Sequence, residues 1–151
     1  MKLGLISDTH GLLRPRAVAA LEGCGLIIHA GDVGDAKILE TLRGLAPVVA
    51  VRGNIDTAEW AQALPLTAEA DFGGARILVI HDIHDLRSDP AAAGYRMVVS
   101  GHSHKAASAM KNGVLYLNPG SAGPRRFRLP ITVASVDLGV TPWTMQLVEV
   151  G

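Results

Sequence analysis

The sequence predicts an α/β protein with two β-sheets, and three observations support this class. In the first third of the chain, short apolar runs alternate with helix-like segments. From about residue 66 the apolar runs follow one another with only short turns between them. Gly and Pro (17 and 8 residues) punctuate the whole chain, without a repeat or a linker. We therefore expect residues 1–151 to form a single domain, which is an ordinary domain length.

The first half predicts parallel strands joined by helices. Strands are expected at 3–7, 26–29 and 47–52, because each is a short apolar run ended by Gly or polar residues. Helices are expected between them, at 15–22 and 35–42. Pro15 suits a first helical turn, and Asp35 is a suitable N-cap for a helix that ends before Gly44. A βαβαβ order of this kind predicts a parallel sheet with helical crossovers.

The second half predicts mainly strands. They are expected at 66–72, 76–81, 97–100, 107–110, 114–117, 131–136 and 144–150. Asn112-Gly113 is a strong hairpin signal, and residues 71–74 form a second turn. The only helix expected here is a short one at 90–94. The chain should therefore contain one sheet built from α/β units and another closed by hairpins.

Composition and charge exclude several functional classes. Lys and Arg together number 14, as do Asp and Glu, so the formal net charge is zero. This balance argues against binding of long nucleic acid or of an anionic membrane. The single cysteine rules out an intramolecular disulfide. No signal peptide fits the first residues, and no apolar run approaches the roughly 18 residues of a membrane helix. We expect a cytoplasmic protein.

Polar side chains follow the buried strands at their carboxyl ends, the edge where ligands bind in open α/β sheets. Asp-x-His and His-x-His place alternate residues on the same side of an extended segment, so that both can face one site. Those able to bind a metal are Asp8, His10, Asp32, Asn54, His81, His102 and His104.

These seven side chains predict a metal centre. Oxygen and imidazole donors without a thiolate suit Mn, Fe, Zn, Co or Ni. Seven donors are too many for one catalytic ion, but they suit two ions about 3.5–4 Å apart that share a bridging carboxylate.

The order and spacing of these residues resemble the calcineurin-like metallophosphoesterases, and most of all the small phosphodiesterases of the YfcE type. The resemblance covers essentially the whole chain. It implies a four-layer αββα sandwich, in which two facing mixed β-sheets have helices outside. The motifs that carry it are Asp8-x-His10, Gly31-Asp32, Gly53-Asn54-x-Asp56, His81 and Gly101-His102-x-His104.

The resemblance also implies roles for the individual residues. Asp56 would fix either the Gly53-Asn54 turn or the tautomer of a histidine ligand, and Asn54 is a candidate for contact with the substrate. Arg125, whose guanidinium matches phosphate geometry, is either a second substrate contact or part of a solvated loop. The first cation would be held by Asp8, His10, Asp32 and His104. The second would be held by Asp32, Asn54, His81 and His102, with Asp32 as the bridge.

The implied activity is that of a phosphoesterase dependent on two divalent cations, with manganese favoured. A hydroxide that bridges the cations would attack phosphorus, and the seven residues would act in catalysis mainly as ligands. We expect a small phosphodiester or nucleotide-like substrate, because the chain is neutral and has no added domain to hold a polymer. The resemblance also suggests a homo-oligomer.

The chain departs from the family pattern in two places. Ile55 stands where the phosphoprotein phosphatases of the superfamily carry a histidine that protonates the leaving group. Asp82 and Ile83 replace the usual Gly and His after His81. The small phosphodiesterases also lack that histidine, so Ile55 supports the resemblance to them, whereas the altered segment after His81 favours a non-catalytic scaffold for protein interaction on the same fold. A phosphomonoesterase also stays open, because the same metals serve both reactions. For Ser7 we expect a local hydrogen bond to the backbone.

Overall fold

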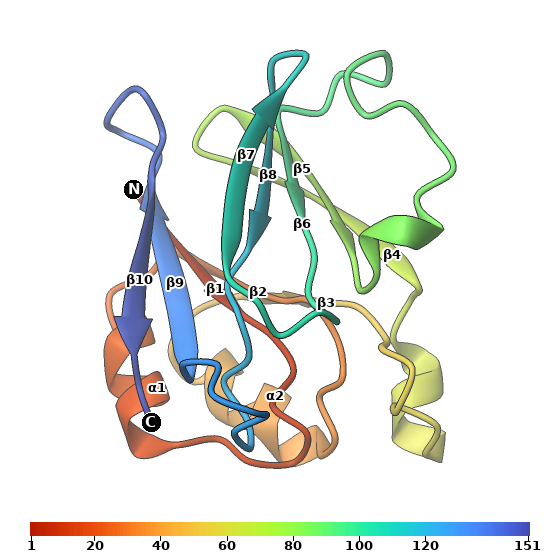
Figure 1. Ribbon diagram of the computed structural model, residues 1–151, viewed down its shortest axis with the longest axis vertical. Helices are drawn as coiled ribbons and strands as arrows, with labels where there is room; N and C mark the ends of the chain where they lie inside the picture. The colour runs from red at the N-terminus through yellow and green to blue at the C-terminus, as the bar shows by residue number, and fades with distance from the viewer.

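The computed structural model describes residues 1–151 and contains two five-stranded mixed sheets that face each other (Figure 1). The strands of the first sheet lie in the order β10-β9-β1-β2-β3. β1, β2 and β3 are parallel, whereas β9 and β10 are antiparallel to their neighbours. Their bounds are β1 Lys2–Ile6, β2 Leu26–His29, β3 Val48–Ala50, β9 Thr132–Asp137 and β10 Met145–Glu149.

The second sheet has the strand order β4-β5-β6-β8-β7. β5, β6 and β8 are parallel, and each edge strand forms an antiparallel hairpin with its neighbour. Asn112 and Gly113 form the turn of the β7–β8 hairpin, as predicted. The bounds are β4 Thr67–Phe72, β5 Ala75–Ile80, β6 Met97–Val99, β7 Ala107–Lys111 and β8 Val114–Asn118.

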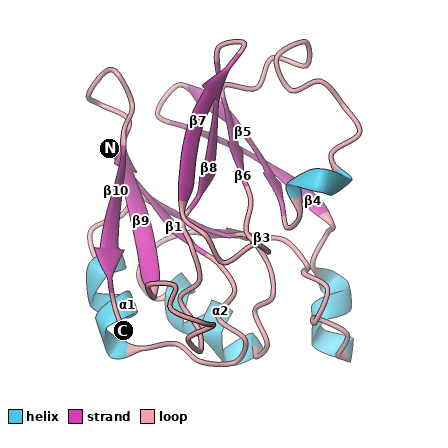
Figure 2. Cartoon of the chain, viewed as in Figure 1, coloured by secondary structure: helices cyan, strands magenta, loops and turns pink.

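Two α-helices pack on the outer face of the first sheet (Figure 2). They are α1 (Pro15–Leu21) and α2 (Ala36–Arg43). The side chain of Asp35 caps α2 by accepting a hydrogen bond from the backbone N–H of Lys37, at 2.9 Å. Two short 3-10 helices complete the structure, η1 (Glu59–Ala63) and η2 (Ile83–Asp85). No helix is long and apolar enough to span a lipid bilayer.

The core follows from the alternation of side chains along the strands. Apolar residues such as Leu5 on β1 and Ile77 on β5 fill the space between the sheets. Leu78 and Ile80 point to the opposite face of the second sheet, where Leu86 and Tyr95 of the β5–β6 connection cover them. The predicted fold class is confirmed. The outermost layer over the second sheet, however, is this connection with η2 rather than an α-helix.

The predicted short helix at 90–94 is instead a series of turns. Side-chain hydrogen bonds connect the end of these turns to the second sheet. Tyr95 donates one to Glu69, which also accepts one from Arg76 at 3.2 Å. The Arg76 guanidinium lies over the Tyr95 ring, 4.6 Å from its centroid. The turns themselves are closed by backbone hydrogen bonds from the Ala93 N–H to the Asp89 carbonyl at 3.1 Å and from the Gly94 N–H to the Ala91 carbonyl at 3.2 Å, which do not continue into a helix.

Candidate metal centre

The loops that follow β1, β2, β3, β5 and β6 meet at one edge of the two sheets, and each carries predicted ligands. The structure brings Asp8, His10 and His104 together, and also Asp8, Asp32 and His81; within each group the ligand atoms lie within 4.8 Å of one another. Five of the predicted ligands, from residues far apart in the sequence, therefore lie close together.

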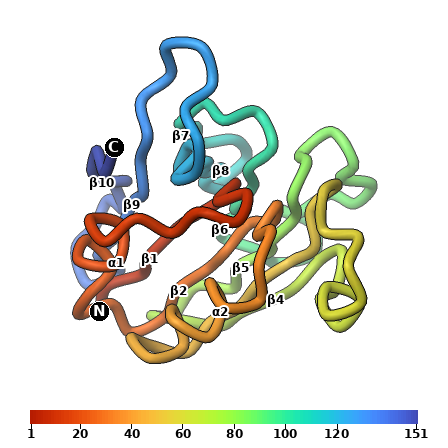
Figure 3. Tube along the Cα trace, turned by 90° about the horizontal axis from the view of Figure 1, so that it is seen from below, coloured from red at the N-terminus to blue at the C-terminus, as the bar shows by residue number.

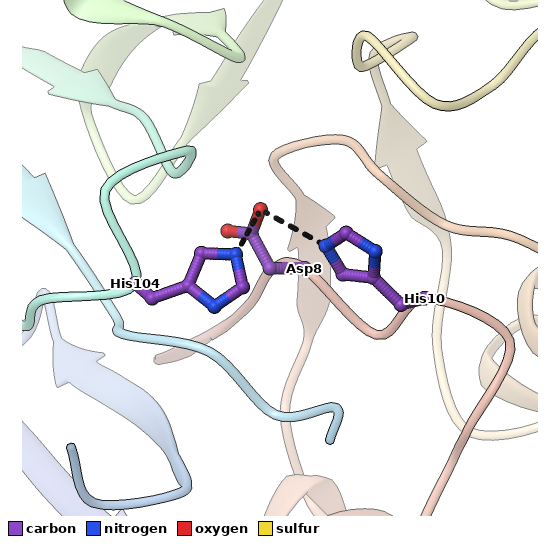
Figure 4. A group of neighbouring side chains, drawn as sticks. All are labelled: Asp8, His10 and His104. Atoms are coloured by element: carbon purple, nitrogen blue, oxygen red, sulfur yellow. Dashed lines mark ion pairs between the residues drawn. The ribbon is translucent and has the colours of Figure 1, made fainter. Parts of the chain in front are cut away.

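Asp8 presents one free carboxylate oxygen to three histidines. Its Oδ2 accepts hydrogen bonds from Ser7 Oγ at 2.7 Å and from the backbone N–H of His102 at 3.1 Å. Its Oδ1 is buried and accepts no hydrogen bond. This oxygen lies 3.5 Å from His104 Nε2 and 3.9 Å from His10 Nε2 (Figure 4). It also lies 3.9 Å from His81 Nε2. Burial raises the pKa of the Asp8 carboxyl, against the opposing effects of the Ser7 hydrogen bond and the two nearest histidines.

Asp32 resembles Asp8, because one carboxylate oxygen accepts a hydrogen bond and the other faces histidines. Its Oδ1 accepts a hydrogen bond from the backbone N–H of Ile55 at 3.0 Å. Its Oδ2 lies 3.4 Å from His10 Nε2 and 3.3 Å from His81 Nε2. Burial would raise the pKa of Asp32, but the hydrogen bonds from His81 and Ile55 and the charges of His81 and His10 lower it overall. Asp32 therefore stays ionised between two imidazoles.

His81 is oriented by a backbone carbonyl. Its Nδ1–H donates to the carbonyl oxygen of Ala30 at 2.7 Å, so Nε2 points into the cluster. Burial disfavours the charged ring, but hydrogen bonds to Asp32 and Ala30 and the charges of Asp32 and Asp8 outweigh it and raise the pKa of His81 to about 9. Without a cation beside it, Nε2 therefore holds a proton at neutral pH.

Asn54 extends the cluster. One terminal atom of its amide lies 3.0 Å from His81 Nε2 and 3.2 and 3.3 Å from the carboxylate oxygens of Asp32. With Nδ2 in that place, the amide donates to Asp32. With Oδ1 there, beside a neutral His81, three acceptors face one another, an arrangement that needs a cation between them.

His102 lies at the rim, outside the two groups of ligand atoms. Its side chain is 46% exposed, and Nε2 lies 3.6 Å from Asp82 Oδ2. The other oxygen of Asp82 accepts hydrogen bonds from the backbone N–H and the Nδ1–H of His84, each at 3.0 Å. The Asp that replaces the family's Gly is thus the nearest partner of His102.

Several predicted ligands share a rare backbone conformation. Asp8, His10, Asp32, His102 and His104 all have φ between +48° and +69°, the left-handed region. Residues other than Gly seldom adopt it, and each such residue costs about 1–2 kcal/mol. Strain of this kind persists only when the surrounding structure imposes it, and here it turns the chain sharply so that the side chains converge.

Asp56 and His29 support the ligand loops from behind. Asp56 accepts backbone hydrogen bonds from Val33 at 3.1 Å, Gly34 at 3.0 Å and Gly53 at 2.9 Å, and so joins the loops after β2 and β3. His29 is fully buried; its Nδ1 accepts from the Gly31 N–H at 3.1 Å, and its Nε2 lies 3.0 Å from Thr9 Oγ1. Because the N–H of Gly31 can only donate, Nε2 carries the proton of His29.

The donor set fits divalent cations. Asp8 Oδ1 and His10 Nε2 are both buried without a hydrogen-bond partner. They lie 3.9 Å from each other, and His10 Nε2 lies 3.4 Å from Asp32 Oδ2. Two ligands that each lie about 2.1 Å from one ion are separated by about 3.0–3.4 Å, so most of these gaps are close to what a shared ion requires. The groups overlap at Asp8, and Asp32 Oδ2 lies between the histidines that the resemblance assigned to different ions.

A sequence profile of the calcineurin-like phosphoesterase superfamily domain matches residues 1–140. The chain belongs to this superfamily. It is 38% identical over 134 residues to a probable metallophosphoesterase of Methanocaldococcus jannaschii, covering 80% of this chain and 68% of that protein. It is also 27% identical over 168 residues to the phosphodiesterase YfcE of Escherichia coli, covering 91% and 88% of the two chains. The predicted family is therefore confirmed.

Solved structures share this fold. The phosphoesterase YfcE of E. coli superposes with a TM-score of 0.71 at 23% identity, covering both chains completely. Vps29 of Chaetomium thermophilum superposes with a TM-score of 0.76 at 19% identity, covering 98% of this chain and 97% of that one. Phosphoesterases and Vps29 proteins thus share the architecture of this superfamily member.

A hollow of about 500 Å³ opens beside the cluster. Asn54, His81 and His102 line it together with two carboxylates, Asp82 and Asp85, and two guanidinium groups, Arg52 and Arg87. This superfamily member therefore presents its candidate ligands to an open hollow lined by side chains of both charges.

Other residues lie where the sequence did not place them. Arg125, a candidate substrate contact, turns into its own loop and donates to the carbonyl of Leu129 at 3.3 Å. Ser7 bonds to the Asp8 side chain instead of the backbone, which corrects the expectation for this residue. The position of Ser7 directly before Asp8 was the only available signal for this contact. The carbonyl of Ala30 that orients His81 has no signature in a sequence.

Proposed function

We propose that this protein is a phosphoesterase dependent on two divalent cations, acting on a small phosphodiester. Membership of the calcineurin-like phosphoesterase superfamily supports a phosphoric ester hydrolase. The relatives named phosphodiesterase, including YfcE, support a diester as substrate. Manganese is a suitable ion for the oxygen and imidazole donors of the site.

The observation that carries this proposal is the pair of free carboxylate oxygens, Asp8 Oδ1 and Asp32 Oδ2. Each is directed at imidazole nitrogens, while its partner oxygen is held by backbone or hydroxyl donors. The first cation would be held by Asp8, His10, Asp32 and His104. The second would be held by Asp32, Asn54, His81 and His102. For this, the His102 side chain would have to turn away from Asp82.

Bound divalent cations make water nucleophilic near neutral pH and offset the negative charge that develops on a phosphate ester during hydrolysis. The chain itself contributes the positions of the ligands and the walls of the hollow. Arg52 and Arg87 add positive charge where a phosphate would enter. Ile55, 40% exposed at this edge, cannot transfer a proton, so this position supplies no acid for the leaving group. A good leaving group, such as a nitrophenolate, should therefore be favoured.

The test is hydrolysis of bis(p-nitrophenyl) phosphate by metal-stripped protein during titration with Mn²⁺. We expect activity that rises with the metal and saturates. His104→Ala should lower it at least 100-fold without unfolding the protein. His84→Ala is the matched control, because His84 is 88% exposed and belongs to neither ligand group. Full activity of His104→Ala would overturn the proposal.

A second candidate is a non-catalytic interaction domain, and one observation favours it: His102 Nε2 lies 3.6 Å from Asp82 and outside both groups of ligand atoms, although the His102 ring packs against that of His81, with 5.2 Å between the centroids. If this arrangement persists, the second cation lacks a ligand. Thermal unfolding with and without Mn²⁺ separates the two functions, because a ligand that binds only the native state raises its Tm. A rise in Tm with Mn²⁺ supports the enzyme, and no change supports the interaction domain.

A further inference from the structure

A second hollow, of about 640 Å³, borders the same His102–Lys105 segment as the ligand hollow. Ser103, Lys105, Phe127, Arg128 and Leu129 line it. His102 borders the first hollow, whereas its neighbours Ser103 and Lys105 border the second. A diester has two arms on one phosphorus, and a second hollow beside the same segment offers a place for the arm that does not leave.

Phe127 is the most exposed large apolar residue of the chain, with 92% of its surface accessible. Its φ is +54°, a left-handed conformation that is uncommon for a bulky residue. The turn around it is closed by a hydrogen bond from the Leu129 N–H to the Arg126 carbonyl at 3.1 Å. The aromatic ring is thus presented to solvent at the tip of an ordered turn, flanked by Arg126 and Arg128.

This turn is tied to the metal centre. It belongs to the loop between β8 and β9, which projects from the body of the molecule in Figure 3. The base of the loop is fixed on the Asp8 segment: Ser121 Oγ donates to the Asp8 carbonyl at 3.1 Å, and the Ala122 N–H donates to the Ser7 carbonyl at 3.0 Å. Gly123 packs so closely on the Asp8 and Thr9 carbonyls that a Cβ would collide with them.

Cationic side chains surround Phe127. Lys105 and Arg128 line the same hollow, and Lys105 directly follows His104 in the chain. Cations at this position attract an anion, and an exposed aromatic ring offers a face on which another ring can stack.

We propose that the second hollow binds the non-leaving arm of the substrate, and that this arm is a nucleoside whose base stacks on Phe127, between the Lys105 and Arg128 side chains that line the same hollow. This inference rests on the proposed function and names its substrate class. A solvated loop without a role would not need an aromatic residue in a left-handed conformation beside a cationic hollow. An anionic membrane is a poorer occupant, because the net charge of the chain is zero.

Two chromogenic esters with the same leaving group test the proposal: thymidine 5′-(p-nitrophenyl phosphate) and methyl p-nitrophenyl phosphate. With Mn²⁺, Phe127→Ala should lower kcat/KM for the thymidine ester about 10-fold, mainly through KM. It should change the methyl ester less than 2-fold. Phe127→Trp should retain activity on the thymidine ester. Val140→Ala is the matched control, because Val140 is also exposed but lies in the hairpin at the other end of β9.

Equal effects of Phe127→Ala on both esters, or none on either, would overturn the nucleoside site while leaving the phosphoesterase intact. If the wild-type protein hydrolyses neither ester, the proposed function fails, and binding then decides the inference. Thymidine 5′-phosphate binding is measured by NMR titration of wild type and Phe127→Ala. Weaker binding to the variant upholds the nucleotide site, and equal binding overturns it.

Discussion

The backbone N–H of His102 donates a hydrogen bond to Oδ2 of Asp8, at 3.1 Å. This contact joins the end of the first strand to the loop after β6 and therefore links the two sheets at the metal centre. It also occupies one carboxylate oxygen and leaves the other, Oδ1, free for the three histidines. The orientation of the key carboxylate is thus set by residues that do not themselves contribute that ligand atom.

Ser7→Ala removes the second donor to Asp8 Oδ2 and should weaken metal binding. A buried hydrogen bond to a charged group contributes about 1.5–3 kcal/mol, so we expect Mn²⁺ affinity to fall about 10-fold and the metal-free protein to lose about 1–2 kcal/mol of stability. Isothermal titration calorimetry and urea unfolding measure these effects. Ser108→Ala, on exposed β7, should change neither. Unchanged affinity in Ser7→Ala would show that this hydrogen bond does not orient Asp8.

The left-handed backbone at His102 predicts that a Gly variant is more stable than an Ala variant, the reverse of the usual order. Gly adopts a φ of +69° without strain, whereas Ala keeps the penalty. His102→Gly should therefore be about 1 kcal/mol more stable than His102→Ala, although both lose the same imidazole. Urea unfolding of the metal-free proteins provides the comparison. The usual order, with Ala the more stable, would show that the backbone at this position is not strained.

His29 should make the stability of the protein fall in mild acid. Burial, aided by the charges of His81 and His10, lowers its pKa to about 3, below the value of about 6.5 in the unfolded chain. Between these values the unfolded state binds a proton that the native state does not. His29 therefore lowers the free energy of unfolding by about 1.4 kcal/mol for each pH unit as the pH falls from 6.5 toward 3.

His29→Gln should be less stable than wild type at pH 7, because it weakens the contacts with Thr9 and Gly31. The difference in unfolding free energy between the two proteins should shrink from pH 7 to pH 5. Urea unfolding at several pH values tests this. A constant difference would indicate that His29 titrates normally in the native state.

Metal binding should expel a proton from His81. The pKa of about 9 lies above the unfolded value, so the bonded imidazolium stabilises the metal-free protein below pH 6.5, and this contribution is lost as the pH rises through 9. A cation competes with the proton for Nε2, so affinity for Mn²⁺ should rise with pH over the same range. Calorimetry at pH 7.5 in two buffers of different ionisation enthalpy counts the released protons. His81→Gln should release fewer protons than His84→Ala, and equal release would contradict this account.

Much of the fold could be predicted from local signals. The apolar runs, the Asp35 cap and the Asn112-Gly113 turn each act over a few residues, and the structure contains the corresponding elements. Which sheet receives the last hairpin depends on long-range pairing, and β9 and β10 extend the parallel sheet instead of the hairpin sheet. The predicted helix at 90–94 is reduced to turns, and Tyr95, which follows them, contacts Glu69 and Arg76 of the second sheet, a long-range contact that no local signal indicates.

For the candidate site, too, the sequence indicates what local signals decide and not what tertiary packing decides. Strand-end positions identify which side chains converge, because the carboxyl ends of parallel strands meet at one edge. They do not indicate which oxygen of Asp32 stays free, since a backbone N–H from another loop decides that. Nor do they show that Asp82 is the partner of His102, or that Phe127 lies beside the segment that carries His104. These relationships are set by tertiary packing.

The measurement that tests the metal centre most directly is anomalous diffraction from a crystal of the protein soaked with Mn²⁺. Two anomalous peaks about 3.5–4 Å apart are expected, both in contact with the Asp32 carboxylate. One peak should lie among Asp8, His10 and His104, and the other among Asn54, His81 and a His102 that has turned away from Asp82. A single peak, or a second peak away from Asn54 and His81, would contradict the two-cation centre.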